Sequence, residues 1–172
     1  MNGNIIQQKK KKKKEKRKKK MIIQALSYQE ALKTNTNIPI ISIRDQYYKY
    51  KLKHKQILKI KFDDVTPYTI RHNLIHPFYQ KEFLHRKPIL FNRKKALEII
   101  QFAEQVRNEE KDLLIHCWAG MSRSVAVGLT LNQIFNLLRE YNPTDFEKSL
   151  KLLLVKAMPN PEVYRIMMKT GI

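Results

Sequence analysis

Short apolar runs alternate with amphipathic stretches along the chain after residue 20. Met21–Ile23, Ile38–Ile43 and Lys55–Phe62 have the spacing of strands, and in the last of them basic and apolar residues alternate. Arg93–Arg107 places its apolar residues at helical spacing, and Leu113–Ile115 is a short apolar run typical of a central strand. This order of strands and helices predicts an α/β fold, a mostly parallel central sheet flanked by helices.

Helix signals dominate the last third of the chain and recur once near its start. A long apolar helix is expected over Ser122–Tyr141, a second over 144–157 and a last one from Asn160-Pro161, so the chain should finish in a helical bundle. Near the start, Ser27 and Glu30 have the spacing of a capping box for a brief helix through Lys33. Residues 63–92, which contain three prolines, are expected to form a long loop.

The basic charge of the chain is concentrated at its N-terminus. Residues 9–20 hold eleven Lys and Arg against one Glu, which is half of the net charge of +20. Like charges at nearly every position repel, so residues 1–20 are predicted to be a disordered Lys-rich tail in front of a domain over 21–172. The tail is suited to nucleic acid or anionic lipid, and the alternative is a solvated tail with no specific partner. The rest of the chain is also basic, which favours anionic substrates.

The cysteine count and the hydropathy narrow the class of protein. One cysteine leaves no internal disulfide and fits a reducing compartment, so a cytoplasmic location is expected. No apolar run approaches the ~20 residues of a membrane span. His72, His76 and His85 lack the spacing of a metal site, and neither metal nor cofactor is expected. We expect a monomer.

One segment carries recognisable chemistry: His116-Cys117-Trp118-Ala119-Gly120-Met121-Ser122-Arg123-Ser124. It follows an apolar strand and leads into a long helix, so the backbone N–H groups of the loop can form a cradle for a tetrahedral dianion. The same N–H groups favour the thiolate of Cys117, and Arg123 offers a bidentate fork for two phosphate oxygens. Gly120 permits the backbone angles of a tight loop, and Ser124 can donate a hydrogen bond to the sulfur. The pattern predicts a phosphate-binding loop with a cysteine nucleophile.

This segment resembles the signature loop of the protein tyrosine phosphatase superfamily, in its compact dual-specificity-like branch, and is most similar to that of small bacterial tyrosine-phosphatase-like proteins. The resemblance extends over most of residues 21–172. It implies a two-step phosphatase whose nucleophile is Cys117, with Arg123 and Ser124 also catalytic. The implied substrate-binding residues are those of the loop: His116, Trp118, Ala119, Gly120, Met121, Ser122 and Arg123. A phosphorylated protein or peptide is the implied substrate.

The resemblance also implies an aspartic acid that protonates the leaving group from a loop after the third strand. Asp64 is preferred, because Asp63-Asp64-Val65 follows the predicted strand as that aspartate does, and Asp63 is the alternative. The chain departs from its relatives by an apparent insertion around Arg71–Lys87. His116 is expected to hydrogen-bond backbone near the loop. Trp118 is expected either at the pocket rim or packed on a neighbouring helix.

Two other functions stay open at this point. An RNA 5′-phosphatase would suit the basic chain, although no basic and aromatic residues interleave as in a base-stacking surface. A phosphoprotein-binding module without turnover would retain the cradle but misplace the acid. A phosphoinositide phosphatase is less favoured, because Trp118, Ala119 and Met121 put no lysine inside the loop.

Overall fold

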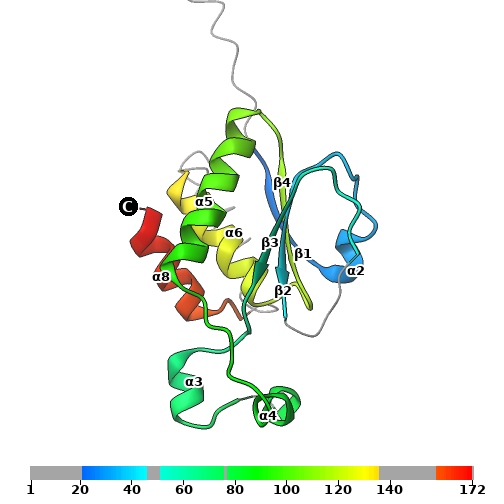
Figure 1. Cartoon of the computed structure of the whole chain (residues 1–172). Coiled ribbons are helices and arrows are strands. Elements are labelled where there is room, and N and C mark those ends of the chain that lie inside the picture. The colour runs from blue at the N-terminus through cyan, green and yellow to red at the C-terminus, as the bar shows by residue number, and fades with distance from the viewer. Residues whose placement is uncertain (1–20, 46–50, 76, 136–157, 172) are drawn as a thin grey trace, which may run out of the picture.

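A four-stranded, fully parallel sheet lies at the centre of the chain (Figure 1). The computed structural model describes residues 21–45, 51–75, 77–135 and 158–171. The strand order β1-β4-β2-β3 places β4 between β1 and β2, and all five residues of β4 are buried. The strands are β1 (Ile23–Ser27), β2 (Ile40–Arg44), β3 (Ile57–Lys61) and β4 (Leu113–Cys117). The predicted parallel α/β sheet is confirmed.

The first strand begins later than its apolar run predicts. Met21 is buried in the core, but the backbone N–H of Ile22 donates to the Asp112 side chain at 3.1 Å instead of to a strand. Pairing with β4 therefore starts at Ile23 and continues to Ser27, which lies opposite Cys117. The prediction of Met21–Ile23 was right about a strand at this place and wrong about its bounds.

In the described part of the chain, three helices cover one face of the sheet and one short helix covers the other (Figure 1). The first group packs on Ile41, Ile43 and Ile115 and forms the main core, since the inward-facing residues of these helices are apolar. The opposite face carries a smaller cluster around Ile40 and Leu114. The helices are α5 (Arg93–Asn108), α6 (Arg123–Ile134) and α8 (Pro161–Gly171) on the first face and α2 (Tyr28–Ala31) on the second.

The segment predicted as a long loop contains two short helices, so that prediction was wrong. They are α3 (Pro67–Arg71) and α4 (Pro77–Phe83), which lie beyond one end of the sheet (Figure 1). Thr66 caps α3 by a reciprocal pair of hydrogen bonds with Thr69, and Pro67 occupies the first turn. Thr69 occupies the position where a capping box ordinarily has Glu or Gln, so the sequence did not indicate that a helix begins here.

The C-terminal helices agree with the prediction as far as they are described. Asn160 caps α8 through its side-chain oxygen, which accepts from the N–H groups of Glu162 and Val163 at 3.1 Å each. The expected helix over 144–157, the end of the expected helix over 122–141 and the expected tail over 1–20 lie outside the described residues. Among the helices described, none is long and apolar enough to cross a membrane.

Candidate active site

The predicted loop connects the central strand to a buried helix. Cys117 is the last residue of β4 and Arg123 is the first residue of α6, and each is only 2% exposed. Five residues, 118–122, therefore make the whole turn from the sheet into the helix. This local geometry directs the first N–H groups of α6 toward the end of β4, where an anion would gain from them.

The sulfur of Cys117 has two polar contacts inside this loop. The backbone N–H of Gly120 donates to Sγ at 3.3 Å, and the hydroxyl of Ser124 lies 3.2 Å from Sγ. Each contact can place a donor hydrogen on the sulfur.

Gly120 takes a conformation that the loop reserves for glycine. Its φ is +74°, in the left-handed region, and a Cβ there would lie 2.5 Å from the backbone nitrogen of Ser27. No side chain fits at that distance without moving the backbone of β1. The turn of the loop over 118–122 is therefore in direct contact with the end of the first strand.

Arg123 is held by the residues that directly follow β2 and β3, Asp45 and Phe62. Its guanidinium forms an ion pair with the carboxylate of Asp45 through Nη1 and Nη2, the latter at 3.3 Å from Oδ2, and Nη1 donates to the carbonyl of Phe62 at 2.9 Å. Within the described part of the chain, the buried Nε atom has no hydrogen-bond partner. One donor of a fixed, fully buried cation is thus left without an acceptor.

The charge state of Arg123 follows from the same contacts. Burial by itself lowers the pKa of Arg123, but the charge and hydrogen bonds of Asp45, followed by the charges of Asp64 and Cys117, raise it above its ordinary value. The guanidinium is therefore cationic at neutral pH. Asp45 was missed by sequence reasoning, because nothing near it in the chain marks it as the partner of a residue 78 positions away.

Asp64 lies at the site, beside the arginine. Its Oδ1 atom accepts hydrogen bonds from the hydroxyl of Ser122 at 2.8 Å and from Nδ2 of Asn160 at 2.9 Å, and its Oδ2 atom lies 3.9 Å from Nε of Arg123. The Asn160 side chain thus caps α8 with its oxygen and holds Asp64 with its nitrogen. Sequence reasoning recognised the first role of Asn160 and missed the second.

Asp63 has a different environment, away from the loop. Its side chain is 1% exposed and accepts two hydrogen bonds from the guanidinium of Arg86, at 2.6 and 2.9 Å, and one from the N–H of Ile89 at 2.7 Å. Every polar atom of this carboxylate is engaged by the segment that follows α4. The two adjacent aspartates therefore face opposite directions, Asp64 toward Arg123 and Asp63 toward Arg86.

His116 is a fully buried residue of β4, opposite Ser42 of β2. Its Nε2 atom lies 2.8 Å from the hydroxyl of Ser42 on β2, and its Nδ1 atom lies 3.3 Å from the carbonyl oxygen of Cys117. Burial lowers the pKa of His116 to about 4, against the opposing effect of the hydrogen bond to Cys117, so the ring is neutral at pH 7. The expected backbone contact is present, and the contact with Ser42 was not foreseen.

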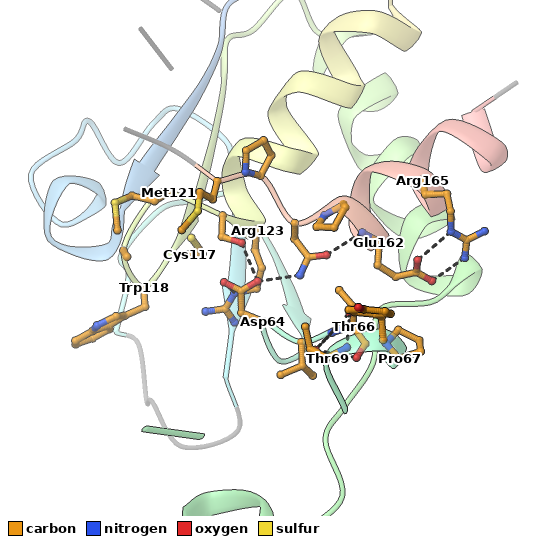
Figure 2. Close-up of a pocket in the computed structure, with 18 residues that line it drawn as sticks. Asp64, Thr66, Pro67, Thr69, Cys117, Trp118, Met121, Arg123, Glu162 and Arg165 are labelled. Carbon is orange, nitrogen blue, oxygen red and sulfur yellow. Dashed lines mark hydrogen bonds and ion pairs between the residues drawn. The ribbon is translucent and has the colours of Figure 1, made fainter. Parts of the chain in front are cut away.

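A cavity of about 1080 Å³ opens above the loop. Figure 2 shows Cys117, Arg123 and Asp64 near its centre, with Trp118 and Met121 on one side and residues of α3 and α8 on the other. Trp118 fulfils both of its expected roles, since it lines the cavity and its ring stacks on Tyr28 of α2 with 6.1 Å between centroids. Among the described residues, no three His, Cys, Asp or Glu side chains are grouped as metal ligands.

Comparison with known proteins gives matches to phosphatases. No family model matches the chain. The curated dual specificity protein phosphatase Mpk3 of Drosophila melanogaster is 40% identical in an alignment of 55 residues, which covers 27% of this chain and 13% of that protein. This chain therefore matches only a small part of the length of that relative.

Solved structures match over far more of the chain. The structure of Tk-PTP in the active form has a TM-score of 0.50 at 17% identity and covers 87% of this chain and 89% of its own. The structure of DUSP15 has a TM-score of 0.44 at 20% identity, over 78% of this chain and 70% of its own. The first match agrees with the parallel sheet order and with the helices on its two faces. The chain has the α/β fold of the protein tyrosine phosphatases.

Proposed function

We propose that this chain is a cysteine-dependent phosphatase that hydrolyses phosphate monoesters, with protein phosphotyrosine as its main substrate. The observation that carries the proposal is the buried Nε of Arg123, which has no hydrogen-bond partner among the described residues and lies in the loop that also presents the sulfur of Cys117. The carboxylate of Asp64 pairs with it electrostatically at 3.9 Å, too far for a hydrogen bond. A phosphate oxygen is the acceptor that this donor lacks. The apolar sides of the cavity, which include Val65, Pro67 and Met158, suit an aryl ring bearing that phosphate.

In the first chemical step, the thiolate of Cys117 attacks phosphorus and the bond from phosphorus to the ester oxygen breaks. Arg123 and the loop N–H groups stabilise the charge that develops on the phosphoryl oxygens. The leaving oxygen takes a proton from the carboxyl group of Asp64, which supplies general acid catalysis. The contacts of Asp64 with Ser122 and Asn160 support this role, because they hold one oxygen and leave the other beside the arginine.

In the second step, Asp64 removes a proton from water and the oxygen of that water attacks the phosphoryl group on Cys117. The bond between phosphorus and sulfur breaks and the thiolate is restored. The hydroxyl of Ser124, 3.2 Å from the sulfur, stabilises the leaving thiolate by donating a hydrogen bond. Inorganic phosphate then leaves the loop.

Hydrolysis of p-nitrophenyl phosphate and of a phosphotyrosine peptide tests this proposal. The wild-type chain should turn over both, and Cys117→Ser should bind phosphate without turnover. A wild-type chain that binds phosphate but hydrolyses neither compound would support a phosphate-binding module instead. Faster release of phosphate from RNA 5′-triphosphate ends than from the peptide would support a polynucleotide phosphatase.

A further inference from the structure

The end of β1 and the start of α2 form a corner that lies against the outer side of the catalytic loop. The N–H of Tyr28 donates to the carbonyl of Trp118 at 3.1 Å. One residue earlier, the backbone of Ser27 is so close to Gly120 that a Cβ there would lie 2.5 Å from its nitrogen. Two consecutive residues of the corner thus touch two residues of the loop, and one of these, Gly120, donates to the sulfur of Cys117.

The ring of Tyr28 extends this contact to the side chains of the loop. It stacks on Trp118 at an interplanar angle of 19°, and its centroid lies 5.8 Å from that of His116. His116 and Trp118 flank Cys117 on either side in the sequence. A single aromatic side chain therefore packs on both neighbours of the nucleophile, with separations typical of favourable ring pairs.

The corner is itself fixed by the capping box that the sequence predicted. A carboxylate oxygen of Glu30 accepts from both the N–H and the hydroxyl of Ser27, each at 2.7 Å, and the N–H of Glu30 donates back to that hydroxyl at 3.2 Å. The hydrogen bonds from the Ser27 backbone and hydroxyl lower the pKa of Glu30, so the box is intact at neutral pH. The proposed chemistry gives this exposed carboxylate no other role.

We propose that Tyr28 is a positioning residue for the catalytic loop, and that Glu30 keeps Tyr28 in place by locking the corner. Tyr28 touches no reacting atom in this account. Its contacts with Trp118, His116 and the backbone of the loop fix the distance between the Gly120 N–H and the sulfur of Cys117. The inference rests on the proposed function for its effect on turnover. Its effect on the loop itself is independent of turnover.

The loop carries its own spectroscopic probe, because Trp118 is the sole tryptophan of the chain. In Tyr28→Leu, we expect the emission of Trp118 to shift to longer wavelength and acrylamide to quench it more strongly, since the stacked ring is lost. Tyr28→Phe keeps the ring and should restore the wild-type emission. Gln29→Ala, at the exposed next position of α2, is the matched control and should leave emission unchanged.

Reactivity of Cys117 gives the second readout. The rate of alkylation by iodoacetamide at a fixed pH reports the environment of the sulfur, and it should change in Tyr28→Leu as the Gly120 contact loosens. For substrate hydrolysis we expect a fall in kcat of about tenfold, the factor equivalent to one good ring pair, with a smaller change in KM. Glu30→Ala should shift all readouts in the same direction by a lesser amount, and Glu30→Gln should restore them, because glutamine also completes a capping box.

These outcomes separate the inference from the proposed function. If the wild-type chain hydrolyses no phosphate ester, the proposed function fails, while emission and alkylation still test the positioning role. If Tyr28→Leu does not fold, Glu30→Ala carries the same test at an exposed site. A folded Tyr28→Leu chain with wild-type emission, alkylation rate and kcat would overturn the inference, and so would a Glu30→Ala chain with all three unchanged.

Discussion

Asp45 and Arg123 form a buried ion pair that ties the end of β2 to the first residue of α6. Both side chains are at most 3% exposed, so neither charge is compensated by water. Asp45 orients the guanidinium through two of its nitrogens and leaves the third, Nε, for another acceptor. The arginine is thus already oriented before any anion enters the loop.

Asp45→Asn should weaken both stability and phosphate binding. The substitution keeps the size of the side chain but leaves the charge of Arg123 without a buried partner, so the free energy of unfolding should fall by about 3 kcal/mol. Urea unfolding measures this change, and a raised KM for p-nitrophenyl phosphate should accompany it. Added phosphate should recover part of the stability, because a bound dianion compensates Arg123. Glu104→Gln, at an exposed position of α5, is the control and should be as stable as wild type. An Asp45→Asn chain as stable as wild type would contradict the role given to this ion pair.

Asp64→Asn and Asp63→Asn should have separable effects. Asparagine at 64 removes the proposed acid, so kcat should fall by a factor of about 10² to 10⁴ and the basic limb of the pH–rate profile should disappear, with little loss of stability. Asparagine at 63 breaks the buried pair with Arg86, so the unfolding free energy should fall while the shape of the pH–rate profile stays that of wild type. Loss of the basic limb in Asp63→Asn alone would reverse the assignment.

The loop itself was predictable from the sequence because its determinants are local. The apolar run of β4, the glycine at 120 and the start of α6 lie within about a dozen residues, and their spacing is enough to indicate a phosphate cradle. Asp45, Ser42 and Tyr28 could not be found in this way. Each meets the loop only because the parallel sheet brings β1 and β2 to either side of β4, and no local pattern encodes that contact.

Contacts between distant residues also account for what the sequence left open, as with the two aspartates, and for what it misjudged, as with α3. The choice between Asp63 and Asp64 depends on Arg86 and Asn160, which reach these aspartates from 23 and 96 residues away. The helix α3 depends on a threonine pair that only weakly resembles a capping box. Where a residue's role depends on contacts with distant parts of the chain, the sequence limits the choice to a few candidate residues, and tertiary packing decides between them.

Gly120→Ala should impair the chain more than its small size suggests. An alanine at φ +74° is strained, and its Cβ would lie 2.5 Å from Ser27 N, so both the unfolding free energy and kcat should fall, the former by about 1–3 kcal/mol. Gly128→Ala in α6 is the matched control. A Cβ there finds ordinary contacts at 3.8 Å or more, and the change should stabilise the helix by about 0.5–1 kcal/mol. Equal effects at the two positions would argue against the tight loop.

His116 should make the chain sensitive to acid. Burial lowers the pKa of His116 from 6.5 to about 4, so the unfolded chain binds a proton in this range that the folded chain does not. The contribution of this residue to stability is complete above pH 6.5 and is lost as the pH falls from 6.5 through about 4, and it amounts to about 3 kcal/mol. Urea unfolding at several pH values should therefore show a shallower acid loss in His116→Gln than in wild type.

The control for this prediction is His72→Gln, because His72 is exposed. Its pH dependence should match that of wild type. A His116→Gln chain that loses stability with acid as steeply as wild type would mean that the folded chain protonates His116 in the ordinary range, contrary to the burial of its ring.

Cys117 should carry the phosphoryl group during turnover, and trapping in acid can detect it there. Wild-type chain is mixed with p-nitrophenyl phosphate, quenched in acid within the first turnovers, digested and analysed by mass spectrometry. The account predicts one phosphoryl group on the sulfur of the peptide that contains Cys117, and none in Cys117→Ser. Two results would contradict a cysteinyl-phosphate intermediate. One is steady hydrolysis by the wild-type chain with no phosphoryl group on that sulfur, and the other is hydrolysis retained in Cys117→Ser.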